Sequence, residues 1–150
     1  MEKPRVLLAD DNEATCTLIA ALLHREFLVE IASDGQEAIE KLKSRRYAAI
    51  LLDLLMPVVD GYGVLDFLVR EQPSVLGRVL LVTAAVSTRD LERMRRYPVH
   101  ALIPKPFEVD TLLSLVKQCA DASTDPSFPG PLLAGGMLLM LAAADLLRKM

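Results

Sequence analysis

The sequence lacks a concentration of positive charge. It has 17 lysine and arginine residues against 20 acidic residues, for a formal net charge of −3. The basic residues are scattered, apart from short clusters such as Arg45 with Arg46 and the segment from Arg93 to Arg96. Proteins that bind DNA or RNA usually carry a basic stripe or face. The composition therefore predicts no direct contact with nucleic acid.

Cysteine is also scarce. The two cysteines, Cys16 and Cys119, fall in segments of helical periodicity and do not have the spacing of metal ligands. The N-terminus lacks the charged start, apolar core and small-residue cleavage site of a signal peptide. We therefore expect a cytoplasmic, reduced protein in which both cysteines are small hydrophobic core residues.

Short apolar runs alternate along the chain with segments of helical periodicity. The runs at 5–9, 27–32, 48–53, 78–83 and 101–103 predict five strands. Strands that are apolar throughout and separated by single helices favour a parallel sheet covered on both faces. The prediction is one α/β domain with a flavodoxin-like, doubly wound, five-stranded parallel sheet.

The intervening helices are predicted from apolar spacing. Leu18, Ile19, Leu22 and Leu23 have the spacing of one helical face. Similar spacing predicts helices around residues 38–42, 64–69 and 112–119, and a weaker one from about Ser87 to Arg96.

Polar residues stand where the predicted strands end. They are Asp10 and Asp11 after the first strand, Asp53 at the end of the third, Thr83 at the end of the fourth and Lys105 just after the fifth. The carboxyl ends of parallel strands meet at one edge of a sheet, which is where such folds bind ligands. The sequence thus predicts three carboxylates, one hydroxyl and one ammonium at a single site.

Three converging carboxylates repel one another unless a cation lies among them. Mg²⁺ fits best, because it takes oxygen ligands and is typically held by one or two carboxylates together with phosphate oxygens. A carboxylate can also be the nucleophile toward a phosphoryl group when positive charge and hydrogen-bond donors stabilise the transferring oxygens.

Four sequence pieces carry a family resemblance: LLADDN, LLDLLMPVVDGYGVL, LLVTA and IPKPF, in this order. With them, the chain resembles the receiver domain of two-component response regulators over about residues 4–120. The resemblance implies strand order 2-1-3-4-5 and a single-domain response regulator whose phosphorylation switches its contacts with a downstream protein. The phosphoryl donor would be a phosphohistidine on a sensor histidine kinase or a histidine phosphotransfer protein.

The resemblance also assigns roles to residues. Asp53 would be the phosphoacceptor, with Mg²⁺ held by Asp10, Asp11, Asp53 and the backbone carbonyl of Leu55. Lys105 would pair with Asp53, and Thr83, Ala84 and Lys105 would bind the phosphoryl group. The bond between Lys105 and Pro106 would be cis and would point the lysine inward.

One position departs from the family pattern. Receivers commonly carry tyrosine or phenylalanine three residues before the lysine, and this chain has Leu102 there. A switch through Thr83 and Leu102 would therefore lack the usual aromatic swing. Leu55 and Ala85 carry no group that could orient an attacking water, which predicts slow self-dephosphorylation.

Two other functions remain open at this point. An aspartyl-phosphate hydrolase would use similar residues, but it usually has a second aspartate two residues after the nucleophile, where this chain has Leu55. An unphosphorylated, receiver-like adaptor is the other alternative.

Some of the polar residues also have a purely structural interpretation. Taken alone, Asp10 and Asp11 fit an acidic pair at a helix N-terminus. His24 and His100 fit surface or half-buried structural histidines.

The C-terminal part has a different composition. Residues 1–120 form the predicted receiver, residues 121–131 a linker rich in serine, proline and small polar residues, and residues 132–150 an apolar helix-like tail. The apolar core of the tail, 132–144, is shorter than the roughly 20 residues that a membrane span needs. Docking on the receiver or a homodimer through the tail or the C-terminal face is favoured over a membrane anchor.

Overall fold

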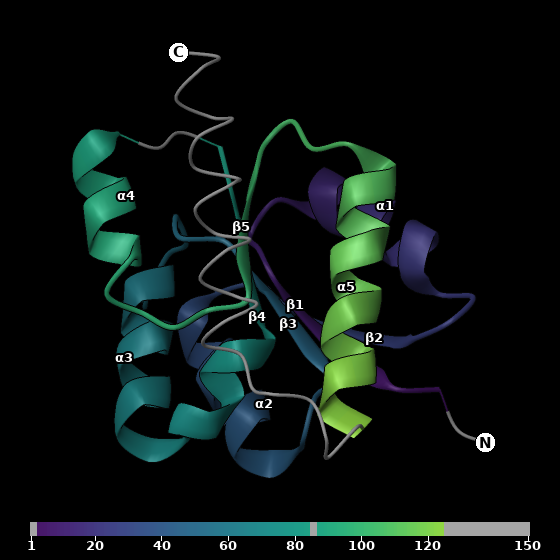
Figure 1. The fold of residues 1–150 in the computed structure, drawn as a ribbon, viewed down its shortest axis with the longest axis horizontal. Coiled ribbons are helices and arrows are strands. Elements are labelled where there is room, and N and C mark those ends of the chain that lie inside the picture. The colour runs from purple at the N-terminus through teal and green to yellow at the C-terminus, as the bar shows by residue number, and fades with distance from the viewer. Residues whose placement is uncertain (1–2, 85–86, 125–150) are drawn as a thin grey trace.

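The computed structural model describes residues 3–84 and 87–124 (Figure 1). It contains five strands, five α-helices and one 3₁₀ helix, in the order β1 (Arg5–Ala9), α1 (Glu13–Leu23), β2 (Leu28–Ala32), α2 (Gly35–Ser44), β3 (Ala49–Leu52), α3 (Gly61–Glu71), η1 (Pro73–Arg78), β4 (Val79–Thr83), α4 (Thr88–Met94), β5 (Ala101–Pro104) and α5 (Val109–Thr124).

The strands form one parallel sheet in the order β2-β1-β3-β4-β5, which confirms the predicted topology. Figure 1 shows α5 and α1 on one side of this sheet and α3 and α4 on the other. Successive side chains of each strand point to opposite faces of the sheet. In β1, Val6 and Leu8 pack with α1 and α5, whereas Leu7 and Ala9 pack with α2, α3 and α4.

The helix boundaries differ from the prediction in three places. The 3₁₀ helix η1 was not predicted, since its sequence PSVLGR has no helical periodicity. Helix α4 is shorter than the predicted 87–96, because Ser87 and Asp90 form a capping box at its start and the helix ends at Met94. Helix α5 continues to Thr124 and so takes up the first four residues of the predicted linker. The rest of the linker and the tail lie outside the described residues.

One predicted helical face is also partly wrong. In α1 the buried residues are Cys16, Ile19 and Leu23, and Leu18 is 50% exposed. Ile19 and Leu23 stand four residues apart and share a face, and Leu18 is rotated about 100° from Ile19 toward solvent.

Both cysteines are buried in the core, as the sequence predicts. Burial raises the pKa of Cys16 to about 11 and that of Cys119 to about 12, so both thiols stay protonated at neutral pH. His100 is more buried than predicted: it is 1% exposed, with Nε2 3.2 Å from Oε1 of Gln118. None of the helices in the two described ranges has the length and hydropathy needed to cross a bilayer.

Candidate functional site

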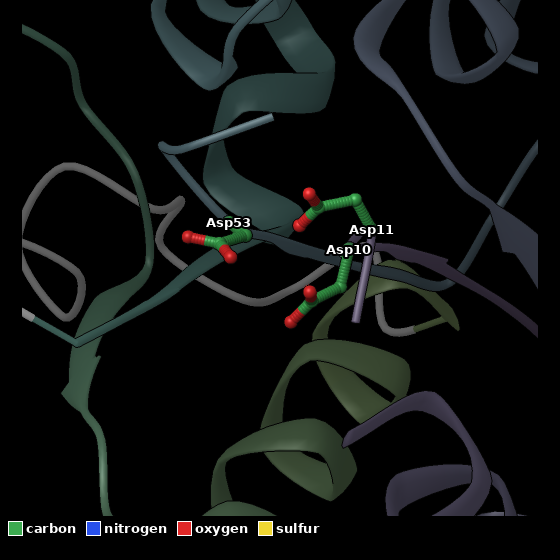
Figure 2. A group of neighbouring side chains, drawn as sticks. All are labelled: Asp10, Asp11 and Asp53. Carbon is green, nitrogen blue, oxygen red and sulfur yellow. The ribbon is translucent and has the colours of Figure 1, made fainter. Parts of the chain in front are cut away.

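Three aspartates meet at the carboxyl edge of the sheet (Figure 2). Asp10 and Asp11 follow β1 and Asp53 follows β3, and each offers a carboxylate oxygen within 4.8 Å of the others. Asp10 and Asp53 are 3% and 7% exposed, whereas Asp11 is exposed. The grouping predicted from the sequence is therefore present in the fold.

The backbone fixes two of these carboxylates just beyond the ends of their strands. The amide of Asp10 donates to the carbonyl of Ala32 at 3.1 Å, and the amide of Asp53 donates to the carbonyl of Ala9 at 2.9 Å. These bonds continue the sheet ladder by one residue. The backbone of both residues is thus fixed by hydrogen bonds to neighbouring strands of the sheet.

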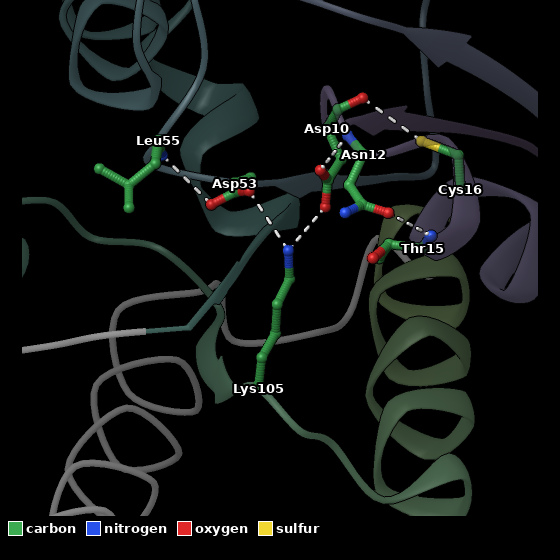
Figure 3. Close-up of polar contacts among 7 residues, drawn as sticks. All are labelled: Asp10, Asn12, Thr15, Cys16, Asp53, Leu55 and Lys105. Carbon is green, nitrogen blue, oxygen red and sulfur yellow. Dashed lines mark hydrogen bonds and ion pairs between the residues drawn. The ribbon is translucent and has the colours of Figure 1, made fainter.

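The start of α1 holds Asp10 in place (Figure 3). The amide of Asn12 donates to Oδ1 of Asp10 at 2.9 Å, and the Asn12 side chain caps the helix by accepting from the amide of Thr15. The thiol of Cys16 donates to the carbonyl of Asp10 at 3.3 Å. The capping role of Asn12 was missed from the sequence, although an asparagine before a helical pattern is a recognisable N-cap signal.

Lys105 reaches between the two buried carboxylates (Figure 3). Its Nζ atom lies 2.7 Å from Oδ2 of Asp10 and 3.2 Å from Oδ2 of Asp53. The amide of Lys105 donates to the carbonyl of Thr83 at 2.9 Å, and the peptide bond to Pro106 is cis, the isomer that the resemblance implies. The contact with Asp10, which is the shorter of the two, was not predicted.

The site carries more negative than positive charge, since one ammonium faces three carboxylates. Burial raises the pKa of Asp53 above its ordinary value, and the Leu55 amide and the Lys105 ammonium offset only part of that effect. Burial also disfavours the charged form of Lys105, but its bond to Asp10 and the charge of Asp53 outweigh this, so its pKa is raised. An all-oxygen donor set with excess negative charge fits a divalent cation such as Mg²⁺.

Thr83 contributes a hydroxyl without a partner. The residue is 1% exposed, and within residues 3–84 and 87–124 its Oγ1 is the one buried side-chain nitrogen or oxygen that makes no hydrogen bond. Leaving a buried hydroxyl unpaired costs about 1–3 kcal/mol. Ala84, the next residue, is exposed.

The loop from β3 to α3 is packed tightly against the end of β3. The amide of Leu55 donates to Oδ1 of Asp53 at 3.2 Å, and the amide of Gly61 donates to the carbonyl of Leu54 at 2.9 Å. A Cβ atom on Gly61 would lie 2.5 Å from the backbone oxygen of Asp53, so a side chain has no room there. Val58 has φ 68° and is 81% exposed, a strained backbone for a β-branched residue that the sequence does not reveal.

Leu102, which stands where receivers commonly carry an aromatic residue, is packed in the core. Leu102 is 1% exposed and belongs to the same cluster as Leu91 and Met94 of α4. Helix α4 is joined to α3 elsewhere: the hydroxyl of Tyr62 donates to Asp90 at 3.4 Å, and the guanidinium of Arg93 lies 3.6 Å from the centre of the Tyr62 ring. These contacts between α3 and α4 were not predicted.

The chain matches the family model described as the response regulator receiver domain, over residues 6–117. Among curated relatives, it is 35% identical over 112 residues to a response regulator receiver protein of Anaeromyxobacter, in a match that covers 74% of this chain and 46% of the relative. It is 36% identical over 114 residues to the transcriptional regulatory protein TrcR of Mycobacterium tuberculosis, covering 75% and 44%. Across the most similar relatives, the match covers from 15% to 54% of the relative's length.

Solved structures give the same result. The receiver domain of a Francisella response regulator superposes with a TM-score of 0.74 and 25% identity, covering 81% of this chain and all of that chain (100%). The receiver domain of a sensor histidine kinase from Pseudomonas aeruginosa, which has a magnesium ion coordinated in its active-site cleft, gives a TM-score of 0.72 and 26% identity, covering 80% and 99%. The sheet, the acidic cluster and these matches agree: the chain belongs to the response regulator receiver domain family of two-component signalling.

Proposed function

We propose that this chain is an aspartate-phosphorylated switch in which Asp53 accepts a phosphoryl group from a phosphohistidine on a partner protein. The observation that carries the proposal is the shared contact of Lys105 with Asp53 and Asp10 within a cluster of three carboxylates. Lys105 already pairs with Asp10 and Asp53. If the cluster served only the stability of the fold, a third carboxylate beside this pairing, that of Asp11, would add repulsion and bring no benefit.

The transfer itself is a displacement at phosphorus. A carboxylate oxygen of Asp53 forms a bond to phosphorus as the bond from phosphorus to the histidine nitrogen breaks, and the electron pair leaves with the imidazole. The Leu55 amide, which donates to Oδ1 of Asp53, orients the carboxylate. The product is an acyl phosphate on Asp53.

In this proposal the site binds Mg²⁺. Asp10, Asp11 and Asp53 would hold the ion together with the backbone carbonyl of Leu55. Bound there, it supplies positive charge that neutralises the phosphoryl oxygens. The three carboxylates in reach of one another support this assignment.

Two side chains of this chain would act on the phosphoryl group itself. The ammonium of Lys105 already bridges two carboxylates and would pair with a phosphoryl oxygen once Asp53 is esterified. The unpartnered hydroxyl of Thr83 would donate to another oxygen, with Ala84 beside it. The buried Thr83 hydroxyl would then gain a hydrogen-bond acceptor, a phosphoryl oxygen. This new hydrogen bond would favour the phosphorylated state.

The switch would begin at Thr83 and act on α4. Because Leu102 packs with Leu91 and Met94, a shift of β4 and β5 would be transmitted to α4 through core contacts rather than through an aromatic ring. The phosphoryl group adds about two negative charges at neutral pH, which is enough to bias two arrangements of one surface.

The proposed partners are a sensor histidine kinase or a histidine phosphotransfer protein upstream and a protein target downstream, in the cytoplasm. Several relatives are named transcription factors or regulators. For this chain we propose no direct contact with nucleic acid. We also propose the division into a receiver that extends to the end of α5 at Thr124, a linker after it and an apolar tail at 132–150 that docks or mediates a homodimer rather than entering a membrane.

A hydrolase or an adaptor would behave differently in one experiment. Incubation of the chain with acetyl phosphate and Mg²⁺, followed by intact-protein mass spectrometry, should give one phosphoryl adduct in the wild type and none in Asp53→Asn. Asp60→Asn, a nearby aspartate that caps α3, should keep the adduct. Release of many phosphates per protein from a phosphomonoester would indicate a hydrolase. No adduct on folded protein would indicate an adaptor.

A further inference from the structure

The opposite end of the sheet carries a cleft of about 470 Å³ that is separate from the acidic site. It is lined by residues 42–47, which end α2 and lead into β3, and by residues 71–75 and 78, which end α3 and lead into β4. Helices that connect parallel strands run back along the sheet, so their C-terminal ends lie at the edge away from the strand C-terminal ends. The cleft is thus at the far edge from Asp53.

The charge of the cleft is strongly positive, although the chain as a whole has a net charge of −3. Its lining includes one carboxylate, Glu71, and four cationic side chains: Lys43, Arg45, Arg46 and Arg78. A smaller adjoining cleft shares Lys43 and Glu71 and adds Arg70. Arg45 pairs outside the cleft with Glu30, and Glu30 is shared with two further cations, so it offsets only part of the charge of Arg45.

Arg46 and Arg78 are the distinctive pair. Neither makes an ion pair with any residue in the described ranges. Arg78 is half-buried and held in place, since its Nη1 donates to the carbonyl of Tyr47 at 3.3 Å, whereas Arg46 is exposed. Burial and the nearby charge of Arg46 both lower the pKa of Arg78. Two like charges gathered in one cleft, neither of them in an ion pair with a described residue, favour the binding of an anion.

Helix dipoles explain only part of this arrangement. Cations in the last turns of α2 and α3, such as Lys43 and Arg70, are stabilised by the negative ends of the helices. Arg46 lies beyond the end of α2 and outside that effect, and it lines the same cleft as Arg78.

We propose that this cleft binds a small ligand that carries phosphate groups. The planar guanidinium group recognises phosphate through two parallel hydrogen bonds, and Arg78 has donors beyond the one given to Tyr47. The volume lies in the range of sites for small molecules and cofactors. Ser44, Ser74 and Gln72 also line the cleft and provide neutral polar groups. This binding is independent of the phosphorylation proposed at Asp53.

The test uses the 150-residue chain, inorganic pyrophosphate as the probe and ¹H–¹⁵N NMR, at low ionic strength without Mg²⁺. Saturable shifts are expected for the amides of residues 42–47, 71, 72 and 74–79 and not for those of residues 10–12 and 53. Arg46→Gln should weaken binding about tenfold, the effect of losing one charge-assisted contact. Arg89→Gln is the matched control: it removes the same charge from an exposed position on α4 and should change affinity by less than about twofold.

Arg46 is exposed and makes no ion pair with the residues at 3–84 and 87–124, so its substitution should not endanger folding. A second variant, Arg78→Lys, keeps the charge but removes the planar donor fork, and it should also weaken binding. The absence of saturable shifts, equal losses in Arg46→Gln and Arg89→Gln, or undiminished binding in Arg78→Lys would each overturn the proposal. Tighter binding of a glutamate decamer than of pyrophosphate would overturn it in favour of an acidic protein partner.

Discussion

Lys105 lies closer to Asp10 than to Asp53: its Nζ atom is 2.7 Å from Oδ2 of Asp10 and 3.2 Å from Oδ2 of Asp53. The lysine therefore offsets the charge of a proposed metal ligand as well as that of the proposed phosphoacceptor. The ammonium and a bound Mg²⁺ would act on the same carboxylates, so the presence of each would weaken the attraction of the other to the site.

Lys105→Met should destabilise the Mg²⁺-free protein by about 2 kcal/mol, because it leaves two buried carboxylates without their counter-charge. This is below the cost for a fully buried pair, since the Lys105 side chain is 18% exposed. Added Mg²⁺ should stabilise the variant more than the wild type. Urea unfolding with and without Mg²⁺ measures both effects.

Lys117→Met is the control, because Lys117 pairs with Glu26 at 3.4 Å with both side chains more than half exposed. Its cost should be below about 1 kcal/mol, and its response to Mg²⁺ should equal that of the wild type. Equal responses of Lys105→Met and the wild type to Mg²⁺ would show that the lysine and the metal do not share carboxylates.

Thr83→Val should raise the free energy of unfolding of the unphosphorylated chain by about 1 kcal/mol, because it removes a buried hydroxyl that has no hydrogen-bond partner among the described residues. The same substitution should impair phosphorylation or shorten the life of the adduct. Urea unfolding and a time course of the phosphoryl adduct provide the two readouts. A loss of stability on Thr83→Val would mean that the hydroxyl has a structural partner after all.

Gly61→Ala should destabilise the fold by about 1–3 kcal/mol and reduce phosphorylation, because the new Cβ would lie 2.5 Å from the backbone oxygen of Asp53. Gly63→Ala is a matched substitution in the same helix, where the new Cβ meets the side chain of Val59 at 2.4 Å, and a side chain can rotate away. It should cost less and leave the phosphoryl adduct unchanged. Thermal unfolding and adduct formation compare the two variants, and equal effects would contradict the assigned role of Gly61.

His100 should make stability depend on pH in the weakly acidic range. Burial lowers the pKa of His100 in the folded state, so the unfolded chain binds a proton more readily. Its contribution is complete above the unfolded pKa of about 6.5 and is lost as the pH falls below that value. His100→Gln should therefore lose less stability than the wild type between pH 7 and pH 5, as measured by urea unfolding.

His24→Gln serves as the control, since His24 is exposed at the end of α1. It should keep the pH dependence of the wild type. If His100→Gln also kept it, the pH dependence would have to arise from another group.

The sequence predicts the sheet and the residues at its edge because both depend on local patterns. Continuous apolar strands and single intervening helices determine the parallel topology, and the strand ends then bring Asp10, Asp53 and Lys105 to one edge. These predictions need no knowledge of side-chain conformation.

The features that were missed depend on three-dimensional packing. The closer contact of Lys105 with Asp10 depends on the position of the lysine after β5. Leu18 is exposed because the face of α1 that packs on the sheet contains Ile19 and Leu23. The left-handed Val58 has no signal in its residue type. The extension of α5 into a segment rich in small polar residues shows that composition alone places a helix end poorly.

The most direct test of the proposed function identifies the modified residue chemically. The chain is incubated with acetyl phosphate and Mg²⁺ and then treated with borohydride, which reduces an aspartyl phosphate to homoserine, and tandem mass spectrometry locates the change. The account predicts homoserine at position 53 and nowhere else, with its formation dependent on Mg²⁺. Reduction at another aspartate, or none on protein that is folded and bound to Mg²⁺, would contradict it.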